Sequence, residues 1–373
     1  MKHVLHITPS LPPTICGVGD YATTVGSRME RVQPGLKCRY LSVGYRSMKQ
    51  DSGTLSSRFF WNRVESGLEL FKRCSFRGPE VKLVLHCSGY GYSPDGAPRW
   101  LADAIAKRPV FARDFCIVTF FHELYATGWP WRRAFWHSAR QRNVIGDIAR
   151  ASDGLLTNRP ESARWLERAT ARARGTVRYL PVPSNVGEPD ELPGFDCRRT
   201  QAVIFGGPVV KRPFLRGSNA EKTAKVCQNL GISRLVEIGK PFQIDCKPFA
   251  AAGIEVVPRG FLPRDEVSRE LLDSRIAFFD YFPDALTKSG ILAALSSHGV
   301  ALCCSSSVSN PVEQLLQLES RTTSMQYLME PAADVQLAAI QECGLAARRW
   351  YAGHSSREHA KLLCAPLVGS NTE

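Results

Sequence analysis

Residues 3–22, HVLHITPSLPPTICGVGDYA, contain the pattern that decides the fold. A short apolar run is followed by two adjacent prolines, which exclude a helix there and favour extended geometry before them. Gly17 and Gly19 permit backbone angles that side chains block, or let a ligand approach the main chain closely. Asp20 is placed to cap the amphipathic run YATTVGSRM. The stretch therefore predicts a strand, a glycine turn and a helix, either as a plain connection or as a phosphate site at the helix start.

Similar apolar runs recur along the chain, each followed by a loop and a helical pattern. The clearest are VKLVLHCS (81–88), FCIVTFFHE (115–123), QAVIFGG (201–207), RIAFFDYF (275–282) and GVALCCSS (299–306). Such alternation is typical of parallel sheets covered by helices on both faces. A stretch rich in Pro, Gly and acidic residues, at about 183–198, is the linker candidate. We expect two doubly wound α/β domains that face each other across a cleft, with the ligand site there.

The composition of the 373 residues is that of an ordinary globular protein, with 44% hydrophobic and 22% charged residues. No run approaches the roughly 20 apolar residues of a membrane span, and no signal-peptide pattern opens the chain. We therefore expect a cytoplasmic protein. The 12 cysteines include no CxxC pair, and no metal-site spacing is found, so no metal is expected. His354 and His359 are interpreted as solvated.

Positive charge is concentrated in the first half of the chain. Residues 1–186 hold 28 Lys and Arg against 14 Asp and Glu, a net of +14, and the remaining residues have a net of −1. Each basic run alone is most simply a solvated helix face. An excess confined to one half instead predicts an anionic partner, either the inner membrane face or an acidic polymer. No nucleic-acid-binding signature accompanies the charge, so nucleic acid is not an expected partner.

Five segments in order carry a family resemblance. They are HVLHITPSLPPTICGVGDYA, VTFFHELYATGW (118–129), LPVPSNVG (180–187), VIFGGPVVKRP (203–213) and the stretch that begins with RGFLPRDE (259–266). This set resembles a glycosyltransferase of the GT-B fold and is most similar to the retaining enzymes of family 4. The resemblance implies an acceptor-side domain at 1–186 and a donor-binding domain at 187–350. It also implies a terminal helix, within 351–373, that packs back on the first domain.

The resemblance implies a nucleotide-diphosphate-sugar donor, a saccharide or lipid-linked acceptor and a role in polysaccharide biosynthesis. The implied donor-binding residues are Gly17, Gly19, Lys211, Arg212, Gly260, Phe261, Leu262, Lys288, Ser289 and Gly290. Fixed cations such as Lys211 and Arg212 would stabilise the charge that develops on the leaving diphosphate. The alternative is that both are solvated surface cations. Thr287 or Ser289 is expected to cap the next helix, whose start would hold phosphates together with Lys288.

His122 and Glu123 are the candidate catalytic residues, at the end of the apolar run CIVTFF. A histidine at a strand end in a cleft can donate a hydrogen bond to a sugar hydroxyl or carry a proton. The resemblance implies that His122 contacts the donor sugar, with Glu123 orienting the ring. The alternative is a structural histidine. The aromatic and basic run WPWRRAFW (129–136) is either core or a lip for the acceptor.

One departure from the family leaves two functions open. Retaining members carry two glutamates seven residues apart around the phosphate-binding helix, whereas residues 284–297, DALTKSGILAALSS, contain no glutamate. Asp284 is the nearest acid. The first function is transfer of a hexose with retention by a divergent enzyme. The alternative is a catalytically inactive GT-B protein that binds a nucleotide-sugar.

Overall fold

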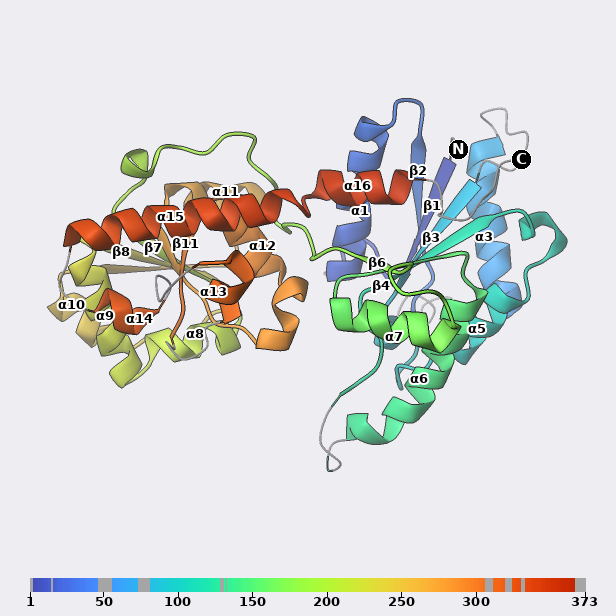
Figure 1. The fold of residues 1–373 in the computed structure, drawn as a ribbon, viewed down its shortest axis with the longest axis horizontal. Coiled ribbons are helices and arrows are strands. Elements are labelled where there is room, and N and C mark those ends of the chain that lie inside the picture. Colours follow the sequence, from blue (N-terminus) through green and yellow to red (C-terminus); the bar gives the residue numbers. More distant parts are fainter. Residues whose placement is uncertain are drawn as a thin grey trace. The chain divides into compact units, whose positions relative to one another are not determined.

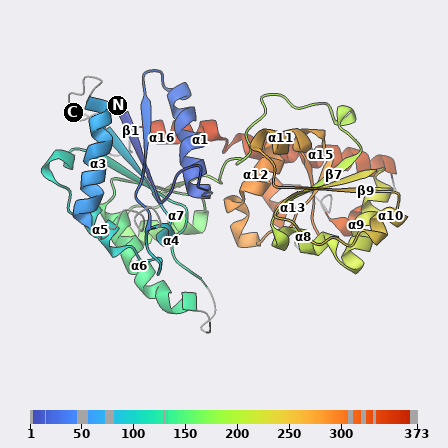
Figure 2. The ribbon, with the colours of Figure 1, turned by 180° about the vertical axis from the view of Figure 1, so that it is seen from behind.

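The computed structural model describes residues 3–14, 16–45, 56–72, 81–127, 131, 133–305, 311–318, 324–329 and 333–365. The chain divides into two compact units. The first comprises Met1–Pro181 with Ser356–Glu373, and the second comprises Val182–Ser355. Each is a parallel sheet with helices on both faces (Figures 1 and 2), which confirms the predicted α/β class.

The first unit has a six-stranded parallel sheet in the order β2-β1-β3-β4-β5-β6. Its strands are β1 (His3–Thr8), β2 (Lys37–Ser42), β3 (Val81–Cys87), β4 (Cys116–Phe121), β5 (Gly154–Thr157) and β6 (Arg178–Tyr179). The central strands are buried almost throughout, because helices cover both faces of the sheet. Apolar runs without alternation follow from that burial.

Two groups of helices cover this sheet. On one face α1 (Gly17–Val32) and α16 (Ser356–Cys364) pack over a core that includes Val4, Val25 and Leu363. The other face carries α3 (Ser57–Lys72), α5 (Arg99–Ala106), α6 (Arg133–Ala151) and α7 (Pro160–Thr170). Two short helical elements of this unit are α4 (Gly89–Tyr92) and η1 (Val110–Ala112). Figure 2 shows α1 and α3 on opposite sides of β1. The helix α16, near the end of the chain, thus belongs to the same unit as β1.

The start of α1 differs from the expected one. The helix begins at Gly17, and its N-cap is Cys16, which makes no side-chain capping bond. Asp20 lies inside the first turn instead of capping it. A Cβ atom at Gly19 would collide with the carbonyl oxygen of Ser10, so this glycine lets the helix start pack against the preceding loop. The close approach at Gly19 is therefore to the chain's own backbone.

The second unit has a five-stranded parallel sheet in the order β11-β10-β7-β8-β9. Its strands are β7 (Gln201–Gly206), β8 (Arg234–Gly239), β9 (Glu255–Gly260), β10 (Ile276–Phe278) and β11 (Ala301–Cys303). Its helices are α8 (Pro208–Leu215), α9 (Ser218–Asn229), α10 (Lys247–Ala251), α11 (Arg264–Asp273), α12 (Gly290–Ser297), α13 (Pro311–Leu316), α14 (Met325–Leu328) and α15 (Ala333–Ala352), with the 3-10 turns η2 (Phe195–Cys197) and η3 (Pro283–Lys288). One continuous core joins both faces of the sheet to these helices.

The carboxyl ends of the paired strands β7 and β8 meet at two glycines, Gly206 and Gly239. A Cβ atom at Gly239 would meet the carbonyl oxygen of Gly206. Gly206 has a φ of +139° and Gly239 a φ of +107°, which other residues rarely adopt. The two glycines therefore hold the ends of the central strands at backbone contact, where the ligands of such sheets bind.

No helix in the described parts of the chain is long and apolar enough to cross a membrane.

Candidate functional site

Two helices of the second unit begin side by side at the carboxyl edge of its sheet. The first, α8, follows β7 directly through its N-cap Gly207. The second, α12, begins at Gly290, and a Cβ atom at Gly206 would touch the Ile291 side chain in its first turn. Because each helix start carries unpaired N–H groups and partial positive charge, two adjacent starts favour an anion with two charged groups.

Ser289 caps α12, as the sequence predicts. Its hydroxyl oxygen accepts a 3.1 Å hydrogen bond from the backbone N–H of Leu292. The preceding turn is held by the linker, since the Val182 N–H donates to the Thr287 carbonyl oxygen at 2.8 Å. The Gly290 backbone lies against the side chain of Asn185. The predicted residues Lys288, Ser289 and Gly290 are thus brought to one helix start.

Lys211 is not an open cation at this edge, and the expectation that it contacts a phosphate is corrected. Its side chain is completely buried, and Nζ pairs with Oε1 of Glu237, whose side chain is 2% exposed. Nζ also donates to the Lys240 carbonyl oxygen at 2.7 Å. The pair ties α8 to β8, because Glu237 and Lys240 flank the end of that strand. Arg212, the next residue, is exposed and remains available to a ligand.

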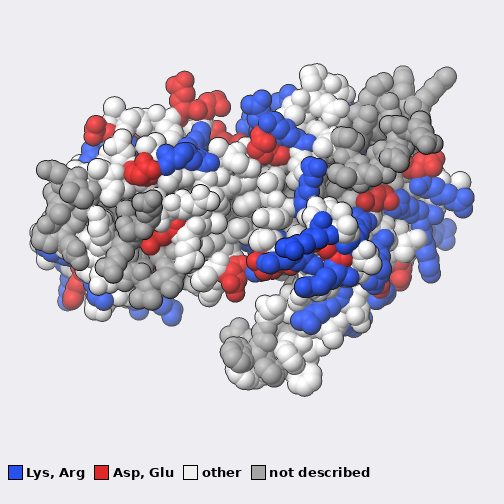
Figure 3. All heavy atoms as spheres, viewed as in Figure 1, with Lys and Arg blue, Asp and Glu red and all other residues white. Residues whose placement is uncertain are grey.

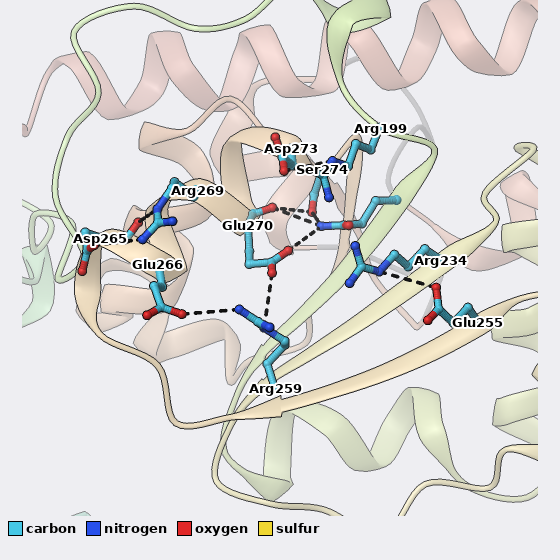
Figure 4. Close-up of polar contacts among 11 residues, drawn as sticks. Arg199, Arg234, Glu255, Arg259, Asp265, Glu266, Arg269, Glu270, Asp273 and Ser274 are labelled. Carbon is cyan, nitrogen blue, oxygen red and sulfur yellow. Dashed lines mark hydrogen bonds and ion pairs between the residues drawn. The ribbon is translucent and has the colours of Figure 1, made fainter.

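The loop that holds the predicted donor-binding residues Gly260, Phe261 and Leu262 leaves β9 beside α11. Gly260 has a φ of +63° with open space around it, and the Phe261 side chain is 75% exposed. Figure 4 shows Arg259, which directly precedes the loop, reaching the carboxylates of Glu266 and Glu270, both at 3.4 Å. These ion pairs fasten the end of β9 to α11 and leave the Phe261 ring in solvent.

A pocket of about 310 Å³ lies at the ends of β10 and β11. It is lined by Val209, Pro213, Asp280, Tyr281, Phe282, Pro283, Cys304, Pro311 and Val312. Asp280 is the one carboxylate in this lining. Burial raises its pKa, although the backbone N–H of Ser305 donates to Oδ1 at 3.1 Å. The sequence alone does not single out Asp280, because this residue follows an apolar strand and belongs to no recognised spacing.

In the first unit His122 lies at the carboxyl end of β4, and its side chain is only 8% exposed. Its backbone N–H donates to the Cys87 carbonyl oxygen at 2.9 Å, and Nε2 of its ring lies 3.2 Å from Nδ1 of His86. Glu123 is exposed and accepts a 3.3 Å hydrogen bond from the Ser88 hydroxyl. The ring of His122 is therefore oriented by His86, which no local sequence pattern singles out, and a role of Glu123 in orienting the ring stays a prediction.

The two glycines of the opening turn have different surroundings. Gly17 is exposed, and a Cβ atom there would meet nothing within 4 Å. Gly19 is buried against Ser10. The structure thus explains Gly19 by packing and leaves Gly17 open at the start of α1.

His354 and His359 are buried, 3% and 1% exposed, which corrects the expectation that both are solvated. Nδ1 of His359 lies 2.7 Å from the Tyr21 hydroxyl, and Nε2 lies 2.8 Å from the Pro181 carbonyl oxygen. This histidine fixes α16 to the first unit. Over the residues that the structure describes, no group of three His, Cys, Asp or Glu side chains could hold a metal ion.

Basic side chains gather on the first unit over α7. Figure 3 shows them as a group on the face drawn there. The helix and the segment after it supply Arg164, Arg168, Arg172, Arg174 and Arg178. The start of α6 adds exposed aromatic rings, with Phe135 42% and Trp136 74% exposed. These two rings pack edge to face, 5.7 Å between centroids. This part of WPWRRAFW is therefore surface and not core.

Comparison with known proteins places the fold. No family model matches the chain, and no curated relative matches it. Solved structures match over 97% of the chain. An E. coli protein bound with UDP-2-fluoro glucose is 8% identical, with 98% of its chain covered and a TM-score of 0.55. An alpha-glucosyltransferase in complex with UDP and a 13-mer DNA is 8% identical, with 97% of its chain covered and a TM-score of 0.54.

A third structure, described as a UDP-N-acetylglucosamine 2-epimerase from Listeria monocytogenes, is 9% identical, with 94% of its chain covered and a TM-score of 0.52. At these identities the likeness defines the fold alone, and that fold is the GT-B type with two Rossmann-like domains. Membership of glycosyltransferase family 4 stays a prediction from the sequence.

Proposed function

We propose that the protein transfers a hexose from a nucleotide-diphosphate-sugar to a saccharide or lipid-linked acceptor, with retention, in polysaccharide biosynthesis. The observation that carries this proposal is the pair of adjacent helix starts at Gly207 and Ser289. Two such starts, with Lys288 and Arg212 nearby, suit the two phosphates of the donor. Two of the solved structures named above are described with UDP or a UDP-sugar, which supports the same donor class. We expect the fixed cations to replace a metal.

The second candidate is a GT-B protein that binds the nucleotide-sugar and turns nothing over. The absence of glutamate from residues 284–297 favours it. Asp280 is the carboxylate that the structure places in the pocket at this edge. Release or transfer of the sugar from a bound donor separates the candidates, because a mere binder leaves the donor intact.

Nucleoside diphosphates should stabilise the folded protein. A ligand that binds only the folded state at 100 times its Kd adds about 2.7 kcal/mol of stability. We expect UDP, GDP or ADP at millimolar concentration to raise the melting temperature, and Lys288→Ala and Arg212→Ala to reduce that rise. The measurement is a thermal shift titration with each diphosphate, with and without chelator.

The matched control is Lys225→Ala, which removes an exposed lysine from the middle of α9. Its response to the diphosphate should equal that of the unmodified protein. No shift with any of the three diphosphates would count against both candidates. A shift that disappears in chelator would contradict the metal-free part of the proposal.

We propose that the basic surface of the first unit associates reversibly with the anionic inner membrane face. The arginines over α7 supply the charge, and the exposed ring of Trp136 suits the interface between headgroups and acyl chains. Binding should require anionic lipid and should weaken as salt rises, because exposed charges are screened beyond about 8–10 Å near physiological ionic strength.

Trp136→Ala should weaken vesicle binding about tenfold, since burying one large apolar side chain contributes about 1.5–3 kcal/mol. Co-sedimentation of the full chain with anionic and neutral vesicles, at low and moderate salt, measures this. Phe261→Ala is the control, because Phe261 is an exposed aromatic of the second unit. Equal binding to neutral vesicles would show that the positive charge serves solubility. Unchanged binding of the Trp136 variant would show that the Trp136 ring does not contact the membrane.

A further inference from the structure

Three histidines form a diagonal row on one face of the first sheet. His6 of β1 is in register with Val84 of β3, two residues before His86. His86 is in register with Phe120 of β4, two residues before His122. Because side chains two residues apart share a face of a sheet, all three rings point to the same side. That face is the one covered by α1 and α16.

The rings are linked nitrogen to nitrogen. His6 Nδ1 lies 2.9 Å from His86 Nε2, and His86 Nδ1 lies 3.2 Å from His122 Nε2. The first two side chains are 0% exposed, whereas His122 reaches the edge of the sheet at 8%. The His6 and His86 rings are nearly parallel, with 17° between their planes and 5.2 Å between their centroids. The row therefore runs from the interior to the carboxyl edge, where ligands of such sheets bind.

Both inner rings are neutral. Burial lowers the pKa of His6 to about 3, and it holds the pKa of His86 well below its usual range, with His6 and His122 adding to that effect. Aromatic and titratable side chains of the neighbouring elements pack around the three histidines. Tyr21 of α1 contacts His86 and His122, and Tyr40 of β2 stacks on His6. His359 of α16 lies near Phe120, the residue of β4 that is in register with His86. A neutral imidazole carries one N–H and one lone pair, so each link has one donor and one acceptor.

Only two proton orders satisfy both links. In the first, His6 Nδ1–H donates to His86, and His86 Nδ1–H donates to His122 Nε2. In the reverse order His6 would carry its proton on Nε2, and that buried atom has no hydrogen-bond partner among the described residues. A buried N–H without an acceptor costs more than an unused lone pair. The first order is therefore the stable one.

We propose that His6 and His86 are positioning residues that lock His122 in the tautomer with its proton on Nδ1. In this state the lone pair of Nε2 is engaged by His86, so His122 donates a hydrogen bond from Nδ1 and does not act as a general base. A ligand oxygen, such as a sugar hydroxyl, is the chemical partner of such a donor. The identity of that ligand as a donor sugar rests on the proposed function, and the tautomer does not.

Nitrogen-resolved NMR of the full chain labelled with 15N-histidine tests the lock directly. We expect His122 to show a protonated Nδ1 and an unprotonated Nε2 at pH 7. His86→Phe removes the ring that engages Nε2 and should give His122 a mixture of both tautomers. If this variant does not fold, His6→Phe should loosen the same order from its buried end. His137→Phe, at an exposed position of α6, should change nothing at His122.

A proton on Nε2 of His122 in the unmodified protein would overturn the proposal, and so would a His122 tautomer unaffected by loss of its neighbour. A second readout compares thermal stabilisation by UDP-glucose with that by UDP. UDP-glucose should raise the melting temperature of the unmodified protein more than UDP does. In both His86→Phe and His122→Phe, UDP should stabilise as before, and UDP-glucose should stabilise no more than UDP. Absence of any nucleotide effect, with the expected NMR result, would contradict the proposed function and leave the tautomer lock intact.

Discussion

Lys211→Met should lower the free energy of unfolding by about 3–5 kcal/mol, because it leaves the Glu237 carboxylate buried without its cation. Lys211 is completely buried, Glu237 is 2% exposed, and the Lys240 carbonyl oxygen loses its donor as well. An exposed lysine would cost little when removed, since surface ion pairs contribute about 0–1 kcal/mol. Urea-induced unfolding of the two proteins without ligand measures the difference.

The neighbouring Arg212→Met is the matched control, because it removes an exposed cation from the same turn of α8. Its unfolding free energy should stay within about 0.5 kcal/mol of the unmodified protein. The double variant Lys211→Met with Glu237→Leu should recover most of the loss, since it removes the stranded charge together with its partner. A loss below about 1 kcal/mol for Lys211→Met would mean that Glu237 finds water or another cation.

The burial of Lys211 also shows where sequence reasoning stops. The segment VIFGGPVVKRP correctly predicts a strand, a glycine turn and a helix start, because those features are local. The partner Glu237 is 26 residues further on, inside the apolar run RLVEIG. No local pattern indicates that pairing, because strand register and helix docking decide it. By contrast, the Ser289 cap involves a donor three residues away and can be read directly.

The contact among His6, His86 and His122 is likewise not predictable from local sequence. The run HVLHIT contains His3 and His6, and the runs VKLVLHCS and CIVTFFHE contain one histidine each, in or just after a predicted strand. Their contact depends on the order β1-β3-β4 and on a two-residue step between neighbouring strands. A parallel arrangement is predictable from the alternating elements, whereas a register is not. The fold was therefore accessible from the sequence, and the surroundings of His122 were not.

Acidification from pH 7 to pH 5 should destabilise the protein by about 4 kcal/mol. Burial lowers the pKa of His6 to about 3 and that of His298 to about 4, below the usual value near 6.5 that each regains on unfolding. Between the folded and the unfolded pKa, the histidine is protonated in the unfolded chain and neutral in the folded chain. The free energy of unfolding therefore falls as the pH falls. Each group contributes about 2 kcal/mol over this interval. The buried His86, also lowered, adds a loss of the same sign.

Unfolding in urea at pH 7 and pH 5 measures this loss, and the slope of stability against pH counts the protons taken up. Asp280 acts in the opposite sense, because burial raises its pKa and its protonation favours the folded state. His298→Gln should make the slope shallower by about one proton, since it removes one of the buried rings. Equal stability at the two pH values would mean that the buried imidazoles accept protons in the folded protein. That result would contradict the claim that His6 and His86 are neutral behind His122.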